Sequence, residues 1–183
     1  MILSDVTIRK YIESGKISVL PEISQHDIRP TGIRVHLGNE ILIAKENQTV
    51  DLASTKELDF ESKNIDSGFL LKPGMFILGV IDEKIITSRD LVCRLEGRST
   101  IARLGLSIHC TSGLIDGNYE EPRSIVLEMK NEGHLNIMLR PKIPIGLITF
   151  EQLTESIEQP SQLQYKGQSS VAAPNLKFKL SYS

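Results

Sequence analysis

Residues 98–131 hold the side chains whose types and spacing are best suited to chemistry. A cationic, hydroxyl-bearing turn comes first, and it contains Arg98, Ser99, Thr100 and Arg103. Arginines and hydroxyls beside main-chain N–H groups are suited to binding a polyphosphate. The apolar run at residues 125–127 then leads to a carboxylate, Glu128, and a carboxylate on a stiff strand is suited to proton transfer. The pattern therefore predicts a site that binds a nucleoside triphosphate and activates water.

The bulk properties indicate a single cytoplasmic domain without a nucleic-acid or membrane partner. At 183 residues the chain is long enough for one domain with a hydrophobic core, which we assign to residues 1–158. The net charge of −2 argues against general affinity for nucleic acid, and no apolar run approaches the ~20 residues that span a bilayer. Two cysteines, Cys93 and Cys110, are too few for a disulfide framework, and the N-terminus does not resemble a signal peptide.

One helix and many short strands are expected. Ser4 and Asp5 form a typical helix start and Gly15 a stop, which predicts a helix of about ten residues. Downstream, alternating or short apolar runs indicate strands at residues 33–37, 41–43, 50–52, 69–71, 76–78, 85–86, 91–92, 106–108, 125–127, 137–139 and 145–150. Pro73 and Gly74 predict a type II turn between two of them. This pattern favours an all-β sandwich or barrel.

The end of the chain differs in composition from the rest. From about residue 159 it is polar and rich in serine, glutamine and lysine, which is typical of a flexible terminus. We therefore treat residues 159–183 as a flexible C-terminal tail. Two interpretations stay open: the tail is filler without a function, or it forms a lid over the active site.

The central motif resembles that of a known family. The segment Gly97-Arg98-Ser99-Thr100-Ile101-Ala102-Arg103-Leu104-Gly105-Leu106 is similar to the Gly-Arg-Ser-Ser-x-x-Arg-x-Gly-x signature of the dCTP deaminases. Met1-Ile-Leu-Ser-Asp5, Leu71-Lys-Pro-Gly74 and Tyr165-Lys-Gly-Gln168 agree with the same family. The resemblance spans nearly the whole chain. It implies the fold of the trimeric dUTPase superfamily, a dUTPase-like distorted β-barrel or jelly roll.

The resemblance assigns roles to two carboxylates. Glu128 aligns with the glutamate of the family's Val-Leu-Glu-x-x-Asn motif, the catalytic proton carrier, which takes a proton from water and returns it to the base. Without the resemblance, Glu128 reads as a solvent-facing residue of a strand. Asp116 aligns with an aspartate that meets the deoxyribose 3′-hydroxyl and, in diphosphate-releasing members, helps to orient a water. Alternatively, Asp116 is simply the first residue of an Asp-Gly turn.

The remaining contacts are implied in the same way. In the family, the arginine and hydroxyl segment reaches across a subunit interface, so the resemblance implies a homotrimer. Its serine and second arginine lie close to the reacting base, which makes Ser99 and Arg103 catalytic residues together with Glu128. The residues implied for substrate binding are Arg98, Ser99, Thr100, Arg103, Asp116, Val126, Leu127, Glu128, Tyr165 and Gln168. The last two belong to the segment that closes over the nucleotide in family members.

The implied reaction is zinc-independent deamination of dCTP to dUTP and ammonia, a step toward the dTTP precursor. The sequence has no His-x-Glu paired with Cys-x-x-Cys, the pattern that zinc-dependent nucleobase deaminases require. Mg²⁺ is expected to arrive with the triphosphate, held mainly by phosphate oxygens and water. Gly113, before the Leu-Ile-Asp turn, resembles members that continue to dUMP and diphosphate. Alternatives that stay open are this bifunctional reaction, dUTP diphosphatase activity alone, and a non-catalytic nucleotide-binding regulator.

Overall fold

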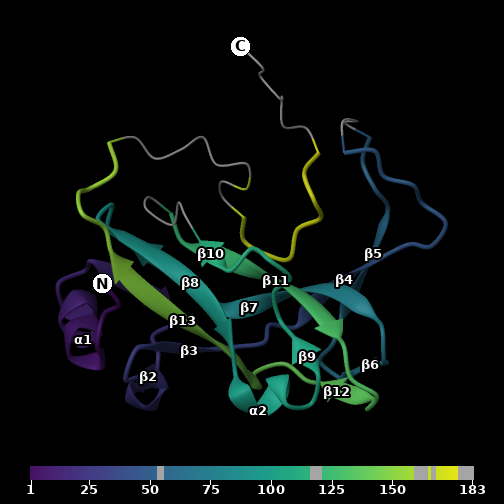
Figure 1. The fold of residues 1–183 in the computed structure, drawn as a ribbon, viewed down its shortest axis with the longest axis horizontal. Coiled ribbons are helices and arrows are strands. Elements are labelled where there is room, and N and C mark those ends of the chain that lie inside the picture. Colours follow the sequence, from purple (N-terminus) through teal and green to yellow (C-terminus); the bar gives the residue numbers. More distant parts are fainter. Residues whose placement is uncertain (53–55, 116–120, 159–164, 166–167, 177–183) are drawn as a thin grey trace.

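The computed structural model of the chain describes residues 1–52, 56–115, 121–158, 165 and 168–176 (Figure 1). Its helices are α1 (Asp5–Glu13), the short 3-10 helix η1 (Gln25–Asp27) and α2 (Ser99–Ala102). Its strands are β1 (Ile17–Leu20), β2 (Ile28–Arg29), β3 (Gly32–His36), β4 (Glu40–Ala44), β5 (Phe60–Asn64), β6 (Phe69–Leu71), β7 (Phe76–Thr87), β8 (Leu91–Gly97), β9 (Leu106–Ser107), β10 (Leu114–Ile115), β11 (Arg123–Asn131), β12 (Ile137–Leu139) and β13 (Pro144–Gln152). The predicted all-β fold with a short N-terminal helix is confirmed.

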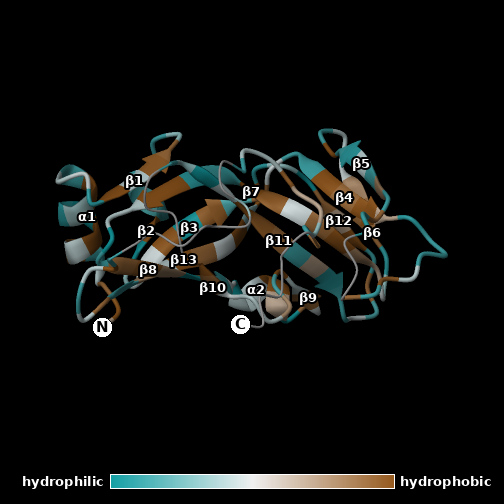
Figure 2. Ribbon diagram, turned by 90° about the horizontal axis from the view of Figure 1, so that it is seen from above, coloured by the Kyte–Doolittle hydropathy of each residue, from teal (hydrophilic) through white to brown (hydrophobic). Residues whose placement is uncertain are grey.

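Two larger sheets build the molecule. One runs in the order β5-β4-β7-β11-β9, with β1 also paired to β7, and the other in the order β10-β8-β13-β3-β2. Strands β12 and β6 pair with each other. The 12-residue strand β7 extends between the end that carries β4 and β5 and the end that carries β1 and α1 (Figure 2). It therefore supports β11, on which Glu128 lies.

The core lies between the two larger sheets. Apolar residues of β3, β7, β8, β11 and β13 meet there, and they include Ile33, Val35, Ile77, Ile81, Leu91, Leu95, Ile148 and Phe150. In β11, the side chains of Leu127 and Met129 are fully buried, and Glu128, the residue between them, lies on the opposite face. Because side chains of a strand alternate between its two faces, Glu128 points away from this core.

The local signals at two turns are confirmed. Helix α1 ends at Glu13, and Gly15 follows with φ +77°, a conformation that suits glycine. Gly74 has φ +79°, and the N–H of Met75 donates to the carbonyl of Lys72 at 3.1 Å. These are the properties of a type II turn with proline at its second position.

The strand predicted at residues 50–52 is wrong. Val50 and Leu52 are 47% and 72% exposed, so their alternation faces no partner sheet. The loop is closed just before them, where the side chain of Gln48 bonds the main chain of Lys45 and Asp59 at 2.7–2.9 Å. The apolar runs at 76–78 and 85–86 belong to one strand, β7.

The division of the chain at residue 158 stays a prediction, since most residues of the predicted tail lie outside the described part. None of the helices in the described ranges is long and apolar enough to cross a membrane.

Candidate active site

Glu128 is held on the outward face of β11. Its neighbours Leu127 and Met129 insert into the core and fix the strand, and Glu128 itself is partly buried opposite Leu78 of β7. Its Oε2 accepts a hydrogen bond from the main-chain N–H of Cys110 at 2.9 Å. No described residue bonds to the other carboxylate oxygen. The side chain is therefore oriented by the protein and keeps one oxygen for a ligand or water.

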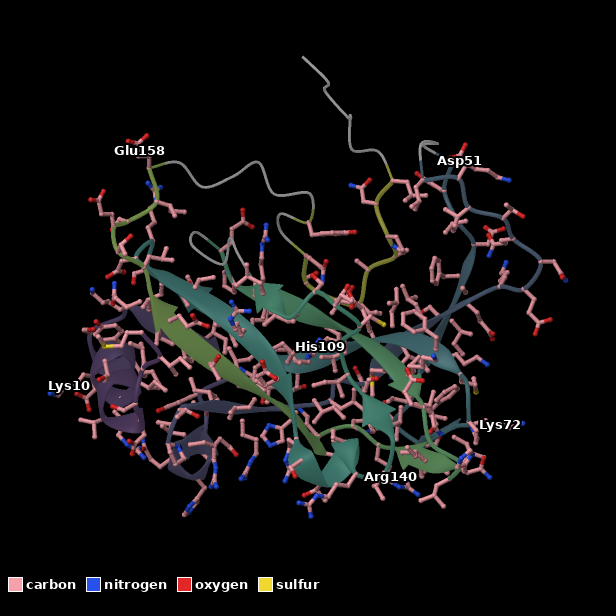
Figure 3. The ribbon with its side chains drawn as sticks, viewed as in Figure 1. Lys10, Asp51, Lys72, His109, Arg140 and Glu158 are labelled. Carbon is pink, nitrogen blue, oxygen red and sulfur yellow. The ribbon has the colours of Figure 1, made fainter. Side chains whose placement is uncertain are left out.

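Cys110 reaches Glu128 because β9 runs antiparallel to β11. Ser107 pairs with Lys130, and continuing this register brings the residues after β9 beside Glu128. His109, which directly precedes Cys110, has a buried Nδ1 with no hydrogen-bond partner among the described residues. Figure 3 shows His109 near the centre of the molecule. Sequence reasoning did not assign these two residues to the site, since only the register of β9 against β11 brings them there.

Gly105 docks the arginine-containing motif onto the end of β11. It has φ +84°, and a Cβ added there would lie 2.5 Å from the main-chain nitrogen of Gly133. Its carbonyl accepts a hydrogen bond from the N–H of Glu132 at 2.7 Å. This close approach explains why the motif needs glycine at its ninth position, and it places α2 just beyond the end of the strand that carries Glu128.

The polar side chains of the motif point elsewhere. Ser99, Thr100 and Arg103 are exposed, and the Nη1 of Arg98 donates to the carbonyl of Pro144 at 2.8 Å. Arg98, with an extended backbone, is the N-cap of α2, and the helix begins at Ser99. Within the described part of the chain, none of these four side chains bonds to Glu128.

One edge of β11 is open beside Glu128. The N–H of Ser124 donates to the C-terminal segment, and Lys130 pairs with β9 on the same edge. Main-chain groups alternate between the two edges of a strand, so those of Val126 and Glu128 face this edge too. The main-chain groups of Leu127 face β7, where it lies opposite Gly79, and its side chain is fully buried, so it fixes its neighbours in the strand. Between Ser124 and Lys130, no described strand pairs with the open edge.

The predicted tail residues contact the chain itself. The hydroxyl of Tyr165 accepts a hydrogen bond from the N–H of Asn175 at 3.1 Å, and its carbonyl accepts one from the N–H of Gln168 at 3.2 Å. The Nε2 of Gln168 donates to the carbonyl of Ser124 at 3.2 Å. Both residues therefore lie in a segment that returns to β11. Asp116, the other predicted substrate contact, lies outside the described residues.

The described side chains give no protein-based site for a metal ion. Among them, no three His, Cys, Asp or Glu residues are grouped to hold one.

The two cysteines differ in their surroundings. Burial raises the pKa of the Cys93 thiol to about 12, while Cys110, beside Glu128, is exposed.

The fold is that of a known nucleotide deaminase. The crystal structure of 2′-deoxycytidine 5′-triphosphate deaminase from Agrobacterium tumefaciens superposes with a TM-score of 0.64 at 16% identity. The superposition covers 82% of this chain and 48% of that chain. At this identity the likeness shows the fold, and the dUTPase-like fold class predicted from the sequence is confirmed.

Curated relatives define the family. The chain is 34% identical to a "dCTP deaminase, dUMP-forming" of Methanobrevibacter smithii, over 87% of this chain and 84% of the relative. It is 33% identical to a "dCTP deaminase" of Haemophilus influenzae, over 96% and 97%. The model of the dCTP deaminase-like family matches residues 2–153. The chain belongs to this family, and it is an enzyme.

Proposed function

We propose that the chain hydrolyses the amino group of dCTP, giving dUTP and ammonia. One observation carries the proposal: a carboxylate on a rigid strand, oriented by the N–H of Cys110, stands beside an open strand edge. Relatives named dCTP deaminase support the choice of substrate. A pure nucleotide binder needs no such carboxylate, so this geometry favours an enzyme over a regulator.

Glu128 supplies both proton transfers of the reaction. Its free oxygen takes a proton from a water molecule, whose oxygen then attacks C4 of cytosine. The same proton passes to ring N3, which leaves a tetrahedral C4 that carries both the new hydroxyl and the amino group. Glu128 then moves the hydroxyl proton to the amino nitrogen, the C4–N bond breaks, and ammonia leaves as the C4 carbonyl of uracil forms. The main-chain groups of Val126 and Glu128 on the open edge offer donors and acceptors for the polar edge of the base.

A neighbouring subunit completes this site. In one chain, Ser99 and Arg103 are exposed beyond the end of β11 and do not bond to Glu128. We therefore assign them to the active site of an adjacent subunit in a homotrimer, where Ser99 and Arg103 meet the reacting base. Arg98 and Thr100 accompany them toward the triphosphate. Asp116 and Tyr165 complete the proposal as contacts of the deoxyribose and of the lid.

Mg²⁺ belongs to the substrate in this proposal. It prefers oxygen ligands, keeps several waters and is commonly bound through phosphates, so a triphosphate supplies its ligands. The guanidinium of Arg98 then neutralises part of the remaining phosphate charge. The proposal requires no zinc, because Glu128 activates the water. It also places the enzyme in the cytoplasm, where two unpaired cysteines remain reduced.

A second product is the other candidate function. Relatives named dUMP-forming favour hydrolysis of dUTP to dUMP and diphosphate at the same site. Gly113 is compatible with both outcomes, because the structure gives it a packing role. Its carbonyl accepts from the N–H of Leu95 at 2.8 Å, and an added Cβ would lie 3.3 Å from the carbonyl oxygen of Leu95.

Product analysis tests the proposal. The purified protein is incubated with Mg²⁺ and either dCTP or dUTP, and nucleotides, diphosphate and ammonia are measured. Ammonia and dUTP without diphosphate mean that the reaction stops at deamination, whereas dUMP and diphosphate from dCTP mean that it continues. Hydrolysis of dUTP alone, or binding of dCTP without turnover, would refute deamination.

A further inference from the structure

The C-terminal segment is bonded to β11 near the open edge (Figure 1). Ser124 makes three hydrogen bonds to it: its N–H donates to the carbonyl of Gln168 at 3.2 Å, its hydroxyl donates to the carbonyl of Ser169 at 3.1 Å, and its carbonyl accepts from Nε2 of Gln168 at 3.2 Å. All hydrogen-bonding groups of Ser124 therefore serve this contact.

An apolar contact follows two residues later. Val171 is only 9% exposed and packs with Leu78 and Val80 of β7, on the face of the sheet that is opposite the main core. Val126 packs against the same cluster from β11. We call Ser124, Gln168, Ser169 and Val171 the tail anchor. Its apolar part adjoins Val126, and Val126 is two residues from Glu128 on the same face.

A bulge in β7 lies directly after the pair that Ser124 makes with Lys84. Ser124 lies opposite Lys84 and Val126 opposite Val80, so β7 advances by four residues while β11 advances by two. Such a bulge interrupts the ladder and re-aims the groups beside it. Glu83 lies within the bulge and is a buried carboxylate that accepts from the N–H of His36 at 2.9 Å and lies 2.6 Å from its Nδ1.

We propose that the tail anchor holds the C-terminal segment on β11 of its own chain, and that Ser124 and Val171 are positioning residues for the nucleotide. The proposal rests on the proposed function for its effect on dCTP, but the anchor itself is defined by contacts within one chain. The anchor closes the upstream end of the open edge, and β9 closes the downstream end. A base on this edge is thereby confined to the stretch that includes Val126 and Glu128.

Val171→Asp tests the positioning role, because it places a charge in the apolar contact. Val6→Asp is the matched control, since Val6 is 57% exposed on α1. We expect Val171→Asp to speed hydrogen exchange at the amide of Ser124 by about tenfold. We also expect it to raise KM for dCTP by about tenfold with much less effect on kcat. Val171→Ile keeps an apolar side chain, so it should leave the exchange rate at Ser124 and KM for dCTP at their wild-type values. Val6→Asp should also change neither quantity.

Unchanged exchange at Ser124 in Val171→Asp would overturn the anchor, and faster exchange with unchanged KM would overturn its positioning role. A wild-type protein that does not turn over dCTP would refute the proposed function alone, since exchange still reports the anchor.

A disulfide tests whether the anchor lies within one chain. Val80→Cys and Val171→Cys are combined with Cys110→Ser, which removes the exposed native thiol, and the assembled protein is oxidised and then blocked with a thiol reagent. We expect a denatured, unreduced product of single-chain mass that contains the linked Val80–Val171 peptides. Covalent dimers or trimers would show that the segment docks on a neighbour, and no cross-link would show that it does not dock. Either result would overturn the proposal.

Discussion

Replacing Glu128 by glutamine separates its chemistry from its place in the structure. Glutamine keeps the size of the side chain, and its Oε1 still accepts the hydrogen bond that Cys110 donates at 2.9 Å. Since Glu128 lies on the outward face of β11, away from the main core, the fold should be unaffected, with a change in stability within about 0.5 kcal/mol. The variant loses the ability to take up and return a proton.

The two effects have different magnitudes. A general base contributes about 10²- to 10⁴-fold, or roughly 3–5 kcal/mol of the activation free energy. Exchanging a charged for a neutral acceptor in the bond from Cys110 weakens it by about 1 kcal/mol, which is roughly fivefold. A loss of about 10²-fold or more in kcat therefore identifies proton transfer, and binding of dCTP should survive.

The assay follows ammonia release from dCTP under saturating conditions, with dCTP binding measured separately by calorimetry. Glu132→Gln is the control, because Glu132 is an exposed glutamate whose carboxylate pairs with Lys130 at 3.0 Å. It should retain wild-type kcat. If Glu128→Gln lost only about fivefold in kcat, the cost would be explained by the hydrogen bond alone, and Glu128 would not be the proton carrier.

Three further predictions concern stability and reactivity. Because burial raises the pKa of the Cys93 thiol to about 12, iodoacetamide at about pH 8 should alkylate Cys110 and leave Cys93 unmodified, as read by peptide mass spectrometry; alkylation of both in the folded protein would contradict this. The ion-pair hydrogen bond from Lys16, 2.8 Å long, lowers the pKa of Asp90. Asp90→Asn should therefore cost about 1 kcal/mol at neutral pH, and urea titrations should show the difference shrinking as the pH falls below about 4; a pH-independent difference would contradict it. Asn131 is fully buried and its Nδ2 donates to two main-chain carbonyls at 2.7 and 3.0 Å, so Asn131→Ala should lower the free energy of unfolding by about 3 kcal/mol; a loss below about 1 kcal/mol would show that water replaces the amide.

The face on which Glu128 lies follows from the sequence alone. Residues 125–127 are all apolar and indicate a strand, and the period of two in a strand puts Leu127 and Met129 on one face and Glu128 on the other. The sequence shows that the motif contains Gly105, but it does not show why glycine is needed at this position. The close approach of Gly105 to Gly133 joins segments almost thirty residues apart, which only the folded chain shows.

Long-range contacts explain what the sequence could not predict. Charged residues 82–84 interrupt the apolar pattern of β7, and their place in a single strand depends on the contact between Glu83 and His36. In the same way, nothing near Val171 in the sequence indicates that Leu78 and Val80 cover it. The hydrogen bond from Cys110 to Glu128 depends on the register of β9 against β11.

The central claim is that this enzyme removes the amino group of dCTP by means of Glu128. The most direct measurement is ammonia release per dCTP consumed, made in parallel on the wild-type protein and on Glu128→Gln. We predict one ammonia for each dCTP lost with the wild type, and almost no release with the variant although it still binds dCTP. Consumption of dCTP without ammonia, or equal release by both proteins, would contradict the account.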